Sequence, residues 1–176
     1  ASITSVTLPS GLTKIGSNAF YGCRSLSSIS IPNSVTTLGQ YAFAQCGLES
    51  VTIPNSVTSI EWGVFWSNDR LMSVVLSNSI SVIPGWAFIN CGLLSQIVIP
   101  ASVSKIGENA LESCKDVYLE SSTPATISSN SFSSDVMLHV PCNSVNAYQS
   151  APIWQFLNIM GNLDYNFTLN ADEGGT

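Results

Sequence analysis

Charged side chains are scarce in this sequence. Only 9% of the 176 residues are charged, against about a quarter in an average soluble domain, and the formal net charge is −6. So few cations argue against nucleic-acid binding, and so little charge argues against a disordered chain or a coiled coil. No apolar run approaches the ~20 residues that a transmembrane helix needs, so no membrane-spanning segment is expected.

Residues and motifs typical of catalytic sites are equally sparse. His139 is the only histidine, which excludes any mechanism that needs two. The common nucleophile, zinc-protease, dithiol and phosphate-loop motifs are all absent. Glu108 and Glu112 lie four residues apart, but we expect them to be solvated surface charges rather than an acid and base pair. No enzymatic activity and no cofactor are therefore predicted.

What the sequence has in abundance is repetition. A phrase of the form Ala-Phe-x-x-Cys recurs, and it is preceded each time by a short alternation such as Ile29-Ser30-Ile31-Pro32. Between the two phrases stands a single aliphatic residue. The column of core aromatic or aliphatic residues has steps of 23, 22, 23, 23 and 21 residues, and its members are Phe20, Phe43, Phe65, Phe88, Leu111 and Phe132.

A period near 23 residues with these columns predicts a leucine-rich repeat solenoid. Each alternating stretch is a short strand with one face inward, and the following proline ends it because proline cannot donate to a ladder. The Ala-Phe-x-x-Cys phrase is expected to be a short helical or 3-10 turn that places Phe in the core. We therefore predict a β-dominated α/β solenoid of about five to six coils, with one parallel sheet and a C-terminal cap.

The cysteines form a column along the solenoid. The column runs through Cys23, Cys46, Cys91 and Cys114, and Asn68 interrupts it. Their side chains should run parallel rather than converge, so free thiols are predicted despite an extracellular setting. One thiol per coil spreads the sulfurs along a line, which argues against a metal site. Because five cysteines cannot all pair internally, a complete disulfide framework is excluded.

The phrases I-x-I-P-x-S-V-x-x-I-G and A-F-x-x-C resemble the BspA-like leucine-rich repeats of bacterial, Bacteroides-type surface proteins. The resemblance covers residues 3 to about 114. Residues 115–160 resemble the capping unit of such proteins, apart from Cys142, where a charged or small residue is more common. The segment 161–176 is a tail that resembles the start of a β-repeat domain. This family resemblance implies a secreted or surface-anchored, adhesin-like protein, with no fixed functional residues to transfer.

The N-terminal end of the chain leads to two further expectations. The first residue is Ala1, so we expect either that a signal peptide has been removed or that the chain is an excised piece. The solenoid begins directly in a repeat, without a polar cap, and further residues are expected upstream in the parent protein.

The exposed face of the sheet is the first candidate binding surface. Its outward positions change from small hydroxyls in the N-terminal half to larger apolar groups in the C-terminal half. The proposed partner-binding strip consists of Val75, Val98, Tyr118, Met137 and His139. We expect His139 to be a surface residue. Such a strip is typical of a protein interface. The alternative is that these residues are there because they favour β-strands, and that the sheet binds no ligand.

Aromatic residues beside the core column form a second candidate surface. Tyr21 and four further rings occupy positions that hold small or polar residues in other coils, and these four are Tyr41, Trp62, Trp66 and Trp86. They can stack on sugar rings or on a protein partner. The alternative is half-buried packing on the back of the solenoid, without a ligand.

The function favoured by the sequence is a non-enzymatic, extracellular binding module that holds a host or matrix protein on its sheet. Two alternatives stay open. One is a structural spacer that displays other domains, and the other is a carbohydrate-binding accessory module that uses the aromatic residues.

Overall fold

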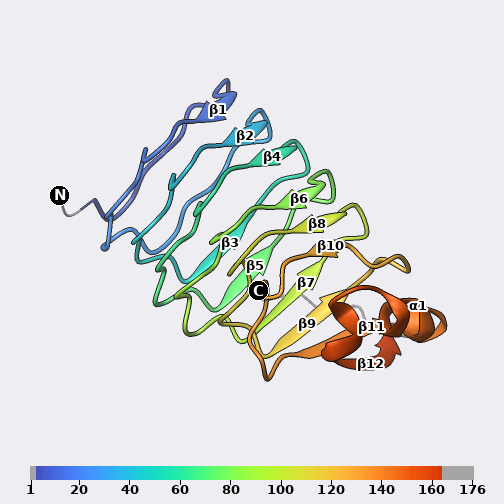
Figure 1. The fold of residues 1–176 in the computed structure, drawn as a ribbon. Helices are drawn as coiled ribbons and strands as arrows, with labels where there is room; N and C mark the ends of the chain where they lie inside the picture. The colour runs from blue at the N-terminus through green and yellow to red at the C-terminus, as the bar shows by residue number, and fades with distance from the viewer. Residues whose placement is uncertain (1–2, 164–176) are drawn as a thin grey trace, which may run out of the picture.

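The computed structural model describes residues 3–163 as a column of stacked coils, with about seven turns and little helix. The first coil lies at one end of the column and a helical segment lies at the other (Figure 1). This confirms the predicted β-dominated leucine-rich repeat solenoid, with about seven turns where five to six coils were expected.

The alternating phrases form one series of parallel strands. Neighbouring strands pair residue by residue; for example, Val51 pairs with Val74 and Ile97 with Val117. The series consists of β3 (Ser50–Thr52), β5 (Ser73–Val75), β7 (Gln96–Ile99), β9 (Asp116–Leu119), β11 (Met137–Pro141) and β12 (Asn158–Leu163). It is divided into a two-stranded and a four-stranded sheet, because β5 lies beside β7 without a ladder between them.

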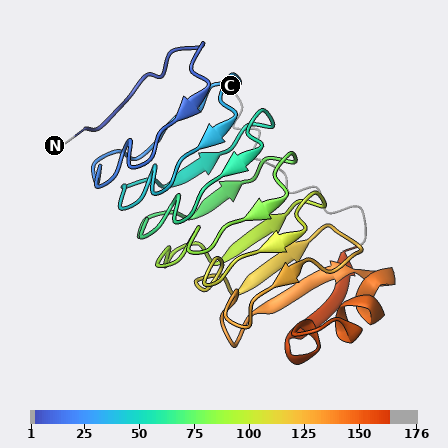
Figure 2. The same cartoon turned by 45° about the horizontal axis from the view of Figure 1, so that its top comes forward.

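A second series of parallel strands lies along another side of the coils (Figure 2). Each strand has two residues and ends in the single aliphatic residue of its repeat, which is buried, as at Ile15 and Leu38. These strands are β1 (Lys14–Ile15), β2 (Thr37–Leu38), β4 (Ser59–Ile60), β6 (Val82–Ile83), β8 (Lys105–Ile106) and β10 (Thr126–Ile127). The expected single sheet is therefore corrected to two series, because the aliphatic positions also stack and hydrogen-bond between coils.

The Ala-Phe-x-x-Cys phrases are turns rather than the predicted helical or 3-10 segments. Within the described residues, helix and 3-10 helix occur only after Pro141. The reason is that a residue of positive φ directly precedes each phrase, and it interrupts a right-handed helix. These residues are Asn18, Tyr41, Gly63, Trp86 and Asn109. The backbone bonds instead to the next coil, as when Phe43 N–H donates to Val64 O at 2.9 Å.

The core is a stack of aromatic rings along the axis of the column. Phe43, Phe65 and Phe88 are fully buried, and consecutive rings lie 5.5 Å apart with interplanar angles of 6° and 7°. Phe20 stacks on Phe43 at 5.3 Å at the N-terminal end. The predicted phenylalanine column is confirmed, because the near-constant repeat length places the same residue above itself in every coil.

The cysteine column lines the turns next to this core, and its four cysteines are free thiols, as predicted. Cys46 Sγ donates to Phe20 O at 3.1 Å, and Cys91 Sγ donates to Phe65 O at 3.3 Å. Asn68 replaces a cysteine in the same role, since its Nδ2 donates to Phe43 O at 2.8 Å. The column therefore satisfies a buried carbonyl of the preceding coil.

The C-terminal end is covered by η1 (Cys142–Ser144), α1 (Val145–Ser150) and η2 (Trp154–Phe156). Tyr148 and Trp154 are buried there, and their polar atoms donate to Ser121 O at 2.9 Å and to Ala125 O at 2.8 Å. Phe156, by contrast, is 82% exposed, because η2 turns only Trp154 inward.

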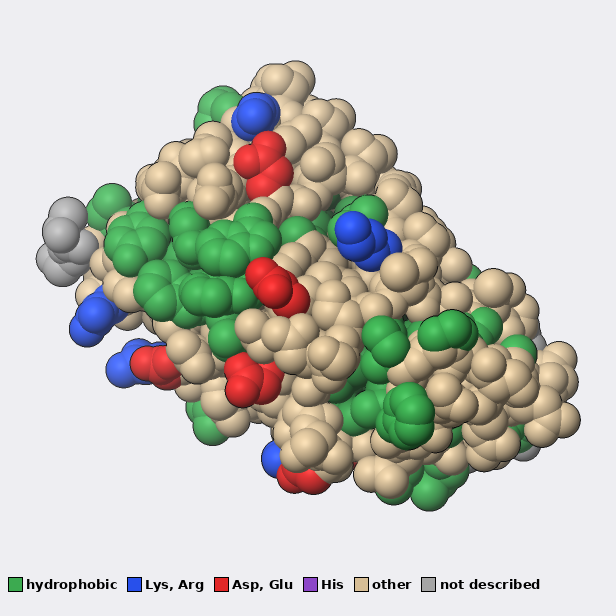
Figure 3. Space-filling view, in the orientation of Figure 1, with side chains coloured by type: hydrophobic (Ala, Val, Ile, Leu, Met, Phe, Trp, Pro, Cys, Tyr) green, Lys and Arg blue, Asp and Glu red, His purple; other side chains and the backbone are tan. Residues whose placement is uncertain are grey.

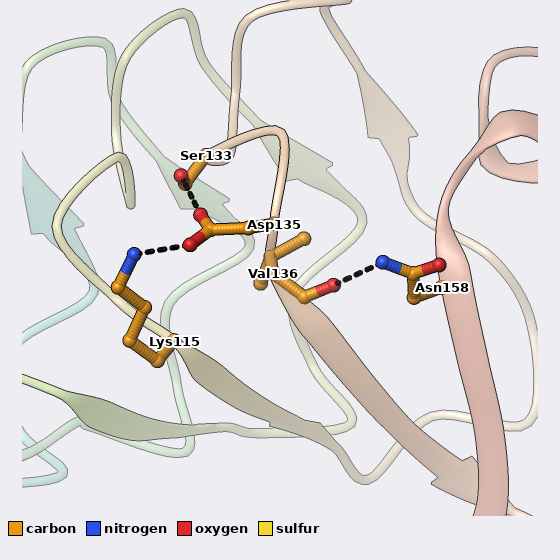
Figure 4. A network of polar contacts seen from close by, with 5 residues as sticks. All are labelled: Lys115, Ser133, Asp135, Val136 and Asn158. Atoms are coloured by element: carbon orange, nitrogen blue, oxygen red, sulfur yellow. Dashed lines mark hydrogen bonds and ion pairs between the residues drawn. The ribbon is translucent and has the colours of Figure 1, made fainter.

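Polar contacts join the last coils to one another (Figure 4). Lys115 Nζ lies 2.5 Å from Asp135 Oδ2, and Ser133 Oγ donates to the other carboxylate oxygen of Asp135. Asn158 Nδ2 donates to Val136 O at 3.4 Å. These contacts link the starts of β9, β11 and β12. The predicted tail lies outside the described residues, except for residues 161–163, which belong to β12.

Candidate binding surfaces

The predicted strip lies on the outward face of the four-stranded sheet and of the neighbouring β5. The parallel register pairs Val98 with Tyr118 and Tyr118 with His139. It then pairs His139 with Met160 of β12, which the sequence interpretation did not include. Val75 stands on β5 beside this row and is 57% exposed. We call Val75, Val98, Tyr118 and Met160 the sheet row.

His139 lies between Tyr118 and Met160 of the sheet row, but it is not the surface residue that was expected. It is only 7% exposed, because Tyr118 stacks on its ring at 4.2 Å with an interplanar angle of 10° and β12 runs along its other side. Its Nε2 atom lies 2.7 Å from Asp116 Oδ1. His139 therefore offers little contact area of its own and instead holds the Tyr118 ring in place.

Met137 does not belong to the same row. The register pairs it with Asp116 on one side and Asn158 on the other, which places it in the adjacent row of outward positions. Met160, 44% exposed, takes the place in the row that was expected for Met137. A strand at residues 158–163 is difficult to recognise because Gly161 stands in a segment without regular alternation.

The second surface is an aromatic cluster on the turns of the first four coils. We use this name for Tyr21, Tyr41, Trp62, Trp66 and Trp86. Tyr41 contacts Trp62 edge-on at 5.4 Å and Trp66 at 5.7 Å, and Trp62 stacks on Trp86 at 4.6 Å. Tyr21 contacts Trp66 at 6.4 Å. Figure 3 shows a continuous apolar patch on this face, over the coils of the N-terminal half.

Small residues of neighbouring coils make room for these rings. A Cβ atom on Gly63 would lie 2.5 Å from the Tyr41 ring, and one on Gly85 would lie 2.7 Å from Trp62 Nε1. Tyr41 and Trp86 also hold positive φ angles of 54° and 61°, which bulky residues rarely adopt. The positive φ angles give the cluster a conformational cost, and glycines in the next coil leave the space that its large side chains occupy. Apart from the 44% exposed Tyr21, its rings are half-buried.

Chemically reactive groups are not assembled at either surface. Burial raises the pKa of the Cys46, Cys91 and Cys114 thiols to about 12, so these side chains are protonated and unreactive at neutral pH. Glu108 and Glu112 are both exposed. In residues 3–163 no three side chains of His, Cys, Asp or Glu gather as metal ligands, and no helix there is long and apolar enough to cross a membrane.

The repeats match a known family model. Residues 1–118 match the BspA type leucine-rich repeat region in six copies. The chain belongs to the BspA-type leucine-rich repeat family. Proteins with such repeats commonly bind other proteins, and the fold is typically non-catalytic. No curated protein matches the chain.

Two solved structures of leucine-rich repeat proteins resemble the chain. A leucine-rich repeat protein of T. pallidum is 27% identical with a TM-score of 0.66, and the match covers 93% of this chain and 71% of that one. A leucine-rich repeat protein of Bacteroides ovatus is 23% identical with a TM-score of 0.56. That match covers 90% of this chain and 45% of the other, so the chain spans less than half of the Bacteroides protein.

Proposed function

We propose that this chain is a non-enzymatic binding module of a bacterial surface or secreted protein, and that it holds a protein partner on the sheet row. The observation that carries the proposal is the alignment of Val98, Tyr118 and Met160 by the parallel register, with the exposed Val75 beside them. Apolar side chains in a continuous row can exclude water from an interface.

Tyr118 is the residue best placed to anchor a partner. Its ring stacks on His139, which in turn lies within hydrogen-bonding distance of Asp116. A ring that is already held in place loses little conformational freedom when it binds, and tyrosine is enriched among the residues that dominate interface energies. The sheet supports this arrangement rigidly, because β9 is hydrogen-bonded to β7 and β11 on its two sides.

The experiment begins with a panel of purified host matrix proteins and a glycan array, which are tested side by side. For any protein that binds, surface plasmon resonance should show that Tyr118→Ala and Val98→Asp weaken binding. The expected loss for Tyr118→Ala is about 5–30-fold. Ser28→Ala and Ser30→Ala are matched controls on exposed positions of the N-terminal half and should leave the affinity unchanged.

Circular dichroism must show that each variant is folded. If the serine variants lose binding while the Tyr118 and Val98 variants keep it, the sheet row is not the binding face. If no protein and no glycan binds, the proposal fails and the structural spacer becomes the favoured alternative.

A further inference from the structure

A polar pocket opens beside the aromatic cluster. It has a volume of about 350 Å³ and lies among the turns of neighbouring coils. Its walls include Arg24, Asp69 and Arg70 together with the polar side chains of Gln45 and Ser67. We call it the arginine pocket. It lies on the turns of the solenoid, whereas the sheet row lies on the strands, so it is separate from the surface proposed above.

The arginine pocket gathers cationic groups in a protein that has few of them. The chain contains five lysines and arginines, and its two arginines, 46 positions apart in the sequence, both line this pocket. In the part of the chain that the structure describes, neither guanidinium forms an ion pair, whereas Lys14 and Lys115 each pair with a carboxylate. Two arginines and one aspartate give the pocket a formal charge of +1 on a chain of −6.

The buried part of the arginine pocket's lining is unreactive. It consists of Cys46 and Gly47. A Cβ atom on Gly47 would lie 2.2 Å from Arg24 O, so the two coils meet here in direct backbone contact. The Cys46 thiol donates to Phe20 O, and its pKa is raised to about 12 by burial, which removes it as a nucleophile. The pocket is therefore suited to reversible binding rather than covalent chemistry.

The arginine pocket continues into the aromatic cluster. Gln45 N–H donates to Trp66 O at 2.7 Å, and Ser67 directly follows Trp66. Tyr21 and Trp66 lie 6.4 Å apart, on the first and third coils, and Ala44 of the coil between them is fully buried. The border of the apolar patch in Figure 3 carries charged side chains of both signs. An apolar ring surface thus adjoins a pocket of hydrogen-bonding and cationic groups.

We propose that the arginine pocket, together with the rings of Tyr21 and Trp66, binds an acidic saccharide. A guanidinium presents a planar fork of donors that matches a carboxylate or sulfate group. The apolar face of a sugar ring can stack on Tyr21 or Trp66, while Gln45 and Ser67 donate to and accept from its hydroxyls. Asp69 favours a sugar over a simple anion, because a carboxylate accepts hydrogen bonds from hydroxyls but repels a bare anion.

The test uses isothermal titration calorimetry with three acidic probes, which are 3′-sialyllactose, trigalacturonic acid and a heparin-derived tetrasaccharide. Lactose is the neutral counterpart of the first probe. Binding of at least one acidic probe is expected, with an affinity about tenfold or more above that for lactose, because the charge-assisted bonds are missing in the neutral sugar. Carboxylated and sulfated probes distinguish the two sources of negative charge. Raising the salt concentration should weaken binding.

Matched variants locate the site. Arg70→Gln should lower the affinity for the acidic probe about tenfold, and Lys105→Gln, which removes an exposed cation outside the pocket, should leave it unchanged. Trp66→Ala removes one of the two rings on which the sugar is proposed to stack. If Trp66→Ala unfolds the chain, Tyr21→Leu is the milder replacement variant. Tyr118→Ala should have no effect, which separates this site from the sheet row.

Several results would overturn the proposal. These are equal binding of lactose and 3′-sialyllactose, equally tight binding of inorganic sulfate, or loss of binding in Lys105→Gln to the same extent as in Arg70→Gln. Arginine-dependent binding of a poly-glutamate peptide in place of all three saccharides would identify the site as one for acidic peptides. Absence of binding by every acidic probe would also refute it.

Discussion

Single side chains in the cysteine column show how the solenoid satisfies its buried carbonyls. Asn68 Nδ2 donates to both Phe43 O and Phe65 O at 2.8 Å, whereas a cysteine such as Cys91 supplies one weaker bond to Phe65 O. An unsatisfied buried carbonyl costs about 1–3 kcal/mol, so even a weak donor contributes. Sequence reasoning could assign the two residue types to one column because both are small and polar enough to occupy a turn.

The burial of these thiols leads to a prediction about their reactivity. In native protein at pH 8, iodoacetamide should label Cys142, which is exposed, and leave Cys46, Cys91 and Cys114 unlabelled. The pKa of about 12 keeps the three buried thiols protonated, and the thiolate is the reactive form. Mass spectrometry after unfolding without a reductant should then find every cysteine labelled. A peptide in which Cys23 is linked to Cys46 would contradict both the structure and the prediction.

At the scale of the strands and turns, glycine sets how closely two coils approach. A Cβ atom on Gly107 would lie 2.4 Å from Gly85 N, a backbone atom that cannot move aside without shifting the coil. We expect Gly107→Ala to lower the free energy of unfolding by about 1–3 kcal/mol, because the two coils must separate. Gly16→Ala is the control, since nothing lies within 4 Å of its Cβ position. Equal urea midpoints for the two variants would show that the coils are not packed this tightly.

The contact between the turns that precede β9 and β11 predicts a pH dependence. The hydrogen bond from Lys115 and then that from Ser133 lower the pKa of Asp135 from 3.8 to about 2. A carboxylate with a lowered pKa stabilises the fold above its unfolded pKa, and this contribution is lost as the pH falls from about 5 towards 2. Because Asp135 is exposed, the effect should be small.

Urea titrations between pH 6 and pH 2 test this, with Asp135→Asn compared with the unaltered chain. The difference between their midpoints should shrink as the pH falls. Lys115→Gln should lower the urea midpoint at pH 6 as Asp135→Asn does. A difference that stays constant over the whole range would mean that the ion pair does not form in solution.

The strands also show where sequence reasoning stopped. The alternation at Ile97–Ile99 and the proline that follows it predicted β7, because a regular period of two marks a strand with one buried face. The turns were misread as helical, since the same Ala-Phe spacing fits a helix and the positive φ angles at Tyr41 and Trp86 leave no mark in the sequence. Bulky residues at such positions are rare, so no sequence rule anticipates them.

For the whole molecule, the repeat period predicted which residues share a column but not what covers each one. Val98 and Tyr118 fall in one row as expected, because their strands have the same register. The burial of His139 and the place of Met160 depend on β12, which adds a strand after the last recognisable repeat. The arginine pocket was missed because Arg24 and Arg70 lie two coils apart and approach each other only when the coils stack.

Stacked repeats predict a stability that depends on position along the column. Phe65 has a ring on each face, Phe43 and Phe88, both at 5.5 Å, and is fully buried, whereas Phe20 has only Phe43 and is part-buried. Phe65→Ala should lower the free energy of unfolding by about 3–5 kcal/mol, because it opens a cavity in the middle of the column. Phe20→Ala should cost about 2 kcal/mol or less, because a repeat protein can lose its end coil without disrupting the remaining interfaces. Urea unfolding followed by circular dichroism gives both values, and hydrogen exchange should show faster exchange confined to the first coil in Phe20→Ala. Equal losses in the two variants would mean that the coils unfold as a single unit with no dependence on position.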